Sequence, residues 1–222
     1  MAIPASEMFG EVEVYRRARG ALEREGVPYM VVGGQAVACY GHRRPTKDID
    51  FLILKEDAET AVRALERAKF FIRRSDPRWI FQAVCGDVLV DLIFASCTPR
   101  GVVPVTRDWL AHARDAAIAG DTYPVSAPEE LIGLKILAQH ENRSDWWDAE
   151  MILERHRDGL DWERITRISA IDPVKTLAFL LFLETRHPGE AWYPPGVLRR
   201  FWGEAAAELP VDLPIARAGA MA

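Results

Sequence analysis

Residues 48–54, with the sequence DIDFLIL, constrain the fold more than any other segment. Four apolar residues directly after two alternating acids predict a buried central strand. Alternate residues of a strand share a face, so Asp48 and Asp50 are expected to point the same way. Two adjacent carboxylates repel, and a cation between them relieves the repulsion. Magnesium, or manganese, suits such a position because it takes oxygen ligands and keeps phosphate and water in the remaining ones. The alternative for both acids is a plain turn cap.

A third carboxylate has similar surroundings. Asp91 lies within residues 88–94, VLVDLIF, an otherwise apolar strand pattern. An unpaired buried charge is costly, so this acid needs a partner or a metal. If the two strands are neighbours, Asp48, Asp50 and Asp91 could surround two metal ions, an arrangement used for in-line phosphoryl chemistry. The alternative for Asp91 is a solvent-exposed or arginine-paired acid on the strand face.

Gly33 and Gly34 form the next candidate element. They follow the apolar run 29–32 and precede an expected short helix at 35–40. Glycines at a strand-to-helix turn let the backbone approach a phosphate, and a helix N-terminus offers free N–H groups to it. A tight turn without a ligand is the alternative.

The remaining periodicity separates the chain into two halves. Residues 1–125 contain expected strands and helices, whereas 126–222 are helical, with a tail from about 209 that is expected to be loose. The expected fold class is therefore α/β (α+β): a mixed β-sheet flanked by helices, followed by a helical part that completes a cleft. The other expected helices are 6–25, 58–69, one from 126, 145–157, 162–169 and 173–184, and the other expected strands are 70–73 and 79–84, the latter followed by a hairpin turn at 85–87.

Composition excludes several classes of protein. The 222 residues carry a net charge of −5, so a nucleic-acid partner would have to meet a local basic patch. Three cysteines without a CxxC spacing argue against a disulfide framework and a zinc site. No signal peptide and no membrane span are expected, which predicts a cytoplasmic protein.

The segment 44–50, RPTKDID, together with Gly33-Gly34, resembles a known signature. It is similar to the Gly-Gly/Ser turn and the Arg-x-Thr-x-Asp-x-Asp motif of the DNA polymerase β-like nucleotidyltransferase superfamily, over residues 29–94. The resemblance implies that the two glycines hold phosphates and that Arg44 and Thr46 belong to the nucleotide site.

The same resemblance assigns roles to the three acids. Asp48 and Asp50 would bind metal and triphosphate, and Asp91 would be the third metal-binding carboxylate, which activates an acceptor hydroxyl.

The helical half adds a second resemblance. Lys135 with Ala138, then Arg143, and the pair Asp145 and Asp148 resemble the Lys-x-x-Ala … Arg … Lys-Asp-x-x-Asp pattern of abortive-infection (AbiEii)-type nucleotidyltransferase toxins. That pattern implies that Lys135 reaches the triphosphate and that the two acids are functional. Ser144 departs from it, standing where lysine is usual. The alternatives are a surface lysine for Lys135 and a helix N-cap for Asp145.

These residues predict a metal-dependent nucleotidyltransferase that moves an NMP from an NTP to a hydroxyl. The acceptor stays open among the end of a tRNA or other RNA, a protein and a small molecule, and the toxin-like pattern adds a possible antitoxin partner. Two alternatives of other classes are a catalytically inactive nucleotide sensor and a structural interaction partner whose aromatic residues form an interface.

Overall fold

The computed structural model of the chain describes residues 10–42, 45–143 and 145–209. Arg44, Ser144 and the tail beyond residue 209 therefore lie outside the described residues, as does the start of the first expected helix.

The described part alternates strands and helices up to residue 125 and is helical from there on. The strands are β1 (Tyr29–Val32), β2 (Ile49–Ile53), β3 (Phe71–Asp76), β4 (Ile80–Cys85), β5 (Val88–Ile93), β6 (Ala95–Thr98), β7 (Gly101–Pro104), β8 (Arg114–Ile118) and β9 (Asp121–Val125). The helices are α1 (Glu11–Arg24), α2 (Gly33–Cys39), α3 (Ala58–Arg67), α4 (Arg107–Ala111), α5 (Pro128–Ala138), α6 (Asp145–His156), α7 (Trp162–Ser169), α8 (Pro173–Arg186) and α9 (Pro195–Glu208), with short 3₁₀ turns η2 (Lys55–Asp57) and η3 (Arg157–Gly159).

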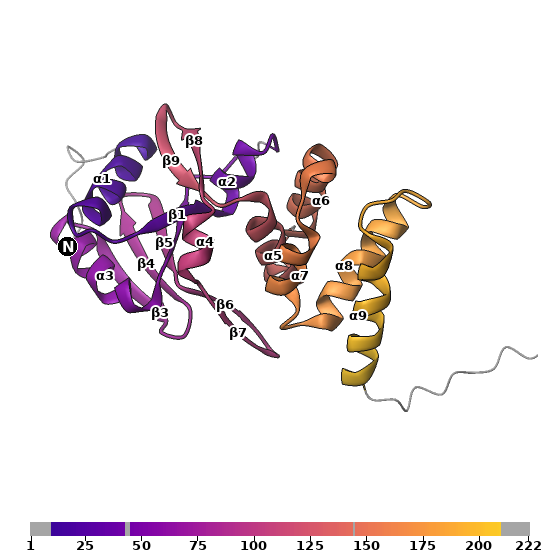
Figure 1. Ribbon diagram of the computed structural model, residues 1–222. Helices are drawn as coiled ribbons and strands as arrows, with labels where there is room; N and C mark the ends of the chain where they lie inside the picture. The colour runs from indigo at the N-terminus through magenta and orange to yellow at the C-terminus, as the bar shows by residue number, and fades with distance from the viewer. Residues whose placement is uncertain (1–9, 43–44, 144, 210–222) are drawn as a thin grey trace, which may run out of the picture.

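Seven strands form one mixed sheet in the order β3-β4-β5-β2-β1-β9-β8, and β6 and β7 form a separate hairpin. The pairs β1–β9 and β2–β5 are parallel, and the other neighbours are antiparallel. Figure 1 shows α1 and α3 beside the sheet, α5, α6 and α7 on its other side, and α8 and α9 farthest away. The expected mixed sheet flanked by helices and followed by a helical part is confirmed.

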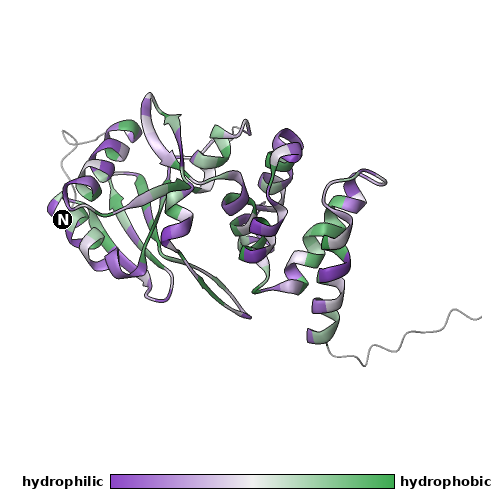
Figure 2. Ribbon diagram, viewed as in Figure 1, coloured by the Kyte–Doolittle hydropathy of each residue, from purple (hydrophilic) through white to green (hydrophobic). Residues whose placement is uncertain are grey.

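One hydrophobic core runs through both halves. It includes Ile49, Phe51 and Leu92 of the sheet and Leu131 and Ile152 of the helical part, all almost fully buried. In Figure 2 hydrophobic colour is concentrated in the strands, whereas α1 and α3 alternate between hydrophilic and hydrophobic along their length. That alternation is typical of helices with one face on a core and one in solvent.

Several elements were not expected from the sequence. They are the β6–β7 hairpin, α4, the β8–β9 hairpin and the final helix α9. Strand β8 lies at the edge of the sheet and is largely exposed, so it lacks the apolar alternation that marks a half-buried strand. Among the described residues, every helix is too short or too polar to span a bilayer.

Candidate functional site

The two central acids lie side by side on the sheet. Strand β2 runs parallel to β5, and Asp50 pairs in register with Asp91. The same row continues to Val32 on β1 and to Gln82 on β4. Paired residues of neighbouring strands project from the same face, so the condition set for a shared acidic site, that the two acid-bearing strands are neighbours, is met.

Gln82 is a site residue that the motif search missed. Its side-chain amide donates a hydrogen bond to Oδ1 of Asp91 at 2.9 Å, and its carbonyl oxygen accepts one from the hydroxyl of Ser75 at 2.7 Å. This chain fixes one oxygen of Asp91 and leaves the other for a ligand. Only the register of β4 against β5 could have indicated it.

Electrostatics single out Asp50. Burial, the charge of Asp91 and the charge of Asp48 raise its pKa to about 7, although Lys135 and Arg143 act in the opposite direction. The pKa of Asp91 is also raised, first by burial and then by Asp48, against the hydrogen bond from Gln82. Asp48 precedes β2 directly and acts on both acids. The three predicted carboxylates therefore repel one another through space.

Gly33 and Gly34 pack against this acidic motif. Gly33 has φ +65, and a Cβ placed there would lie 1.8 Å from Oδ2 of Asp50. A Cβ on Gly34 would meet the side chain of Thr46 at 3.2 Å. The helix begins at Gly33, two residues before the expected start. Close approach to the acid, rather than turn geometry alone, is what requires glycine at position 33.

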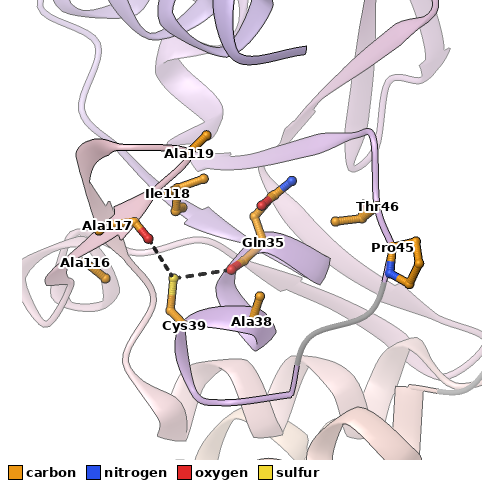
Figure 3. Close-up of a pocket in the computed structure, with 9 residues that line it drawn as sticks. All are labelled: Gln35, Ala38, Cys39, Pro45, Thr46, Ala116, Ala117, Ile118 and Ala119. Atoms are coloured by element: carbon orange, nitrogen blue, oxygen red, sulfur yellow. Dashed lines mark hydrogen bonds between the residues drawn. The ribbon is translucent and has the colours of Figure 1, made fainter.

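Thr46 lines a cavity of about 500 Å³ beside α2. Figure 3 shows that Gln35, Cys39 and Thr46 surround it together with residues 116–119 of the β8–β9 hairpin. The Cys39 thiol lies 3.3 Å from the carbonyl oxygen of Gln35 and 3.9 Å from that of Ala117. Thr46 thus lines this cavity, whereas Asp50 and Asp91 line another one.

Lys135 is buried and ion-paired. Its ammonium group lies 2.7 Å from Asp145 and 2.8 Å from Asp148, and all three side chains are at most 5% exposed. Arg143 also binds Asp145, at 2.5 Å, and His42 lies 3.7 Å from Asp148. The surface-lysine alternative is therefore wrong, and the two acids of the second motif act first as partners of the lysine. Asp145 is the first residue of α6.

These groups meet at one cavity of about 440 Å³ between the sheet and α5. Asp50, Asp91 and Gly33 line it from the sheet side, and Lys135 and Arg143 from the helical side. The cavity therefore brings together five of the ten predicted site residues from segments far apart in the sequence: Gly33, Asp50, Asp91, Lys135 and Asp145. Gly34, Thr46, Asp48 and Asp148 do not line it, and Arg44 lies outside the described residues.

The acids fit a divalent cation that arrives with a phosphate ligand. Within residues 10–42, 45–143 and 145–209, no group of three or more His, Cys, Asp or Glu side chains is arranged as a complete metal site. Two facing carboxylates with raised pKa values nevertheless have the donor chemistry of magnesium, which is usually held by one or two carboxylates plus substrate phosphates. A three-carboxylate ligand set stays a prediction.

Comparison with protein families identifies the chain. The model of a family described as "uncharacterised nucleotidyltransferase" matches residues 12–184, which contain the acidic row, the Gly-Gly turn and the Lys135 cluster. The chain belongs to this nucleotidyltransferase family. Comparison with curated proteins finds no match.

One solved structure supports the fold of this nucleotidyltransferase, and two others are similar at lower scores. The antibiotic-resistance factor ANT(2″)-Ia aligns with a TM-score of 0.51 at 18% identity, over 80% of this chain and 98% of that one. The lincosamide antibiotic adenylyltransferase LnuA, bound to lincomycin, has a TM-score of 0.46 at 13% identity, over 65% and 96%. An antigenic nucleotidyltransferase-like protein from Paracoccidioides brasiliensis has a TM-score of 0.46 at 16% identity, over 88% and 93%.

Proposed function

We propose that this protein is a magnesium-dependent nucleotidyltransferase that moves an NMP from an NTP to a hydroxyl of a small molecule. The observation that carries the proposal is the register of Asp50 with Asp91 across two parallel strands, beside the backbone of Gly33. Repelling, half-buried carboxylates are costly without a cation, and a nucleotidyltransferase has a use for one.

The residues divide the reaction between them. The acceptor oxygen forms a bond to the α-phosphorus, the bond from that phosphorus to the bridging oxygen breaks, and pyrophosphate leaves with the electron pair. Asp91, whose raised pKa makes it a better base than an ordinary aspartate, takes the hydroxyl proton. Asp50 and Asp48 would hold magnesium, which neutralises phosphate charge when it is bound. Gly33, Gly34, Arg44 and Thr46 remain proposed nucleotide contacts.

Lys135, with its partners Asp145 and Asp148, would contribute to nucleotide binding through the position of its ammonium group. The ammonium group donates a hydrogen bond to Asp145 and forms an ion pair with Asp148, and its charge acts on Asp50. These two contacts leave one of its three N–H groups for a ligand. We propose that this N–H donates to the triphosphate, with the two acids fixing its direction.

A small-molecule acceptor is favoured over RNA or protein by the walls of the cavity. Apolar side chains of β2, β5 and α5 line much of it, and an RNA end would require a basic groove instead. A toxin-like enzyme that modifies RNA or protein and is controlled by an antitoxin is the second candidate, carried by the assembled Lys135, Asp145 and Asp148.

The test is label transfer. The purified protein is incubated with each α-labelled NTP, Mg²⁺ and a cell extract, in parallel with Asp50→Asn and with the exposed control Asp87→Asn. Transfer to a small molecule that is lost in Asp50→Asn and kept in Asp87→Asn supports the proposal. Transfer to RNA or protein favours the toxin-like candidate.

Nucleotide binding separates the remaining alternatives. Mg²⁺-dependent NTP binding without any transfer would identify an inactive sensor. Absence of both binding and transfer would leave the structural interaction partner and refute the enzyme.

A further inference from the structure

The cavity beside Asp50 and Asp91 extends well beyond the acids. One continuous segment lines it with the residues Asp91, Ile93, Ala95, Ser96, Cys97 and Pro99. This run follows β5 into β6, and eight residues of extended chain span at most about 26 Å. The lining of the cavity therefore follows the chain from the acid Asp91 along β5 and β6 to the turn at Pro99.

The sheet residues that line the cavity change from acidic to apolar two residues along the strands from the acids. Asp50 and Asp91 pair in one row, and the next row on the same face is Leu52, Ile93 and Ile80. The half-buried Trp79 and Leu134 complete an apolar middle section. A ligand that reaches past the acids therefore meets hydrocarbon rather than polar groups.

A positively charged side chain, that of Lys175, lines the cavity away from the acids. Lys175, in the first turn of α8, lines the cavity. Among the described residues its side chain makes one hydrogen bond, from Nζ to the carbonyl oxygen of Leu137 at 2.8 Å. Asp172 binds the backbone N–H of Lys175 and an Arg100 nitrogen, at 3.0 and 3.4 Å. This link places the start of α8 beside the turn that follows Pro99.

The cationic side chains near the acids differ from Lys175 in having carboxylate partners. Lys135 and Arg143 are both paired with Asp145, so they are already neutralised in part. Lys175 forms no ion pair with a carboxylate within the part of the chain that the structure describes. Half-buried and only partly hydrated, its ammonium group is suited to an anionic partner.

The cavity is lined in turn by the acids, by an apolar section and by Lys175. From this order of linings we infer the acceptor class: an elongated amphipathic molecule with a hydroxyl at one end and an anionic group at the other. Its hydroxyl lies at Asp91, its hydrocarbon body over Leu52, Ile80 and Ile93, and its anion at Lys175. The inference rests on the proposed function and specifies its acceptor.

Three acceptors of equal length test it: ω-hydroxydodecanoate, dodecanediol and ω-aminododecanol. Binding to the full chain is measured by calorimetry, with and without Mg–ATP, and AMP transfer from labelled ATP is measured separately. We expect the hydroxycarboxylate to bind about tenfold more tightly than the diol, as one charge-assisted hydrogen bond would give. The amino alcohol should bind more weakly than the diol.

Charge variants provide the decisive comparison. Lys175→Met should remove the preference, and Lys175→Glu should transfer it to the amino alcohol. The KM for ATP should change less than about twofold, because Lys175 is not one of the proposed nucleotide contacts. Lys69→Met, which changes an exposed lysine remote from the cavity, should behave as the wild type.

Several results would overturn the inference. They are equal binding of the three probes, a preference that survives Lys175→Glu, or a variant that raises the KM for ATP in place of the acceptor's. Label transfer to some other metabolite, without binding of any probe, would refute the acceptor class and leave the proposed function intact. Failure of all NTP binding and transfer would refute the function itself.

Discussion

At the residue scale, the site depends on where a few oxygen atoms are held. Asp91 has one oxygen bound by Gln82, and Asp50 touches the backbone where Gly33 lacks a side chain. Such contacts decide which lone pairs are available to a ligand, and outer partners of this kind commonly affect activity as strongly as some direct ligands.

Removing the support of Asp91 should therefore slow the reaction. Gln82→Ala is expected to lower kcat about tenfold to a hundredfold with a small change in the KM for ATP, because the free carboxylate adopts several orientations. Ser75→Ala, one bond farther out, should have a smaller effect in the same direction. Steady-state kinetics of pyrophosphate release measure both, and an unchanged rate in Gln82→Ala would contradict the role.

The raised pKa of Asp50 gives a pH prediction. Its value of about 7 lies above the ordinary 3.8, so the folded state holds this proton more tightly than the unfolded chain does. Stability without metal should then fall as the pH rises from about 4 to about 7, and binding of a cation should release the proton. Thermal stabilisation by Mg–ATP is accordingly expected to be larger at about pH 8 than at about pH 6.

Asp50→Asn supplies the control for this titration. It removes the repulsion from Asp91, so the melting temperature without ligand at about pH 8 should rise, while stabilisation by Mg–ATP should disappear. A lower melting temperature would show that the carboxylates do not repel.

At the scale of elements, α2 depends on its two glycines unequally. Gly33→Ala meets both a left-handed φ of +65 and the contact with Asp50, so it should destabilise the protein by roughly 2 kcal/mol or more. Gly34→Ala meets only Thr46 at 3.2 Å and should cost less than about 1 kcal/mol, offset by the better helix propensity of alanine. Urea unfolding of the two variants compares them, and equal losses would refute the assignment.

The sequence predicted the elements that carry a clear apolar or alternating pattern of their own. Strands β1, β2 and β5 alternate or run apolar, and their ends were expected to within one residue. The β8–β9 hairpin was missed because β8 is an exposed edge, and α9 because its proline-glycine start and alanine-rich end carry little apolar periodicity.

The residues of the candidate site likewise fall into those that the sequence predicted and those that it did not. The resemblance to the nucleotidyltransferase signature implied that Asp50, Asp91 and Gly33 share one site. Gln82, Lys175 and the pairing of Lys135 with two acids depend on strand register and helix packing, which no local spacing encodes.

At the scale of the whole molecule, the two halves depend on one helix. Helix α5 is buried nearly all round, including Glu129, Glu130 and Lys135, and it packs between the sheet and the other helices. A helix of this kind belongs to one continuous core. We expect the full chain to unfold in urea as a single transition, with coincident circular dichroism and tryptophan fluorescence curves.

Truncation tests the same point. A fragment ending at residue 125 lacks α5 and exposes the apolar face of the sheet beside it, so it should not give a cooperative transition. A fragment that unfolds cooperatively would instead establish residues 1–125 as an autonomous domain.

The continuity of β5 into β6 has a consequence for engineering and for divergence among relatives. Asp91 belongs to the main sheet, whereas Ala95, Cys97 and Pro99 belong to a hairpin that has its own two-stranded pairing. Exchanging that hairpin between homologues would rebuild the distal wall of the cavity and leave the acidic row in place. Acceptor choice could in this way be inherited, lost or redesigned as a cassette of about ten residues, because a self-paired hairpin carries most of its own backbone hydrogen bonds.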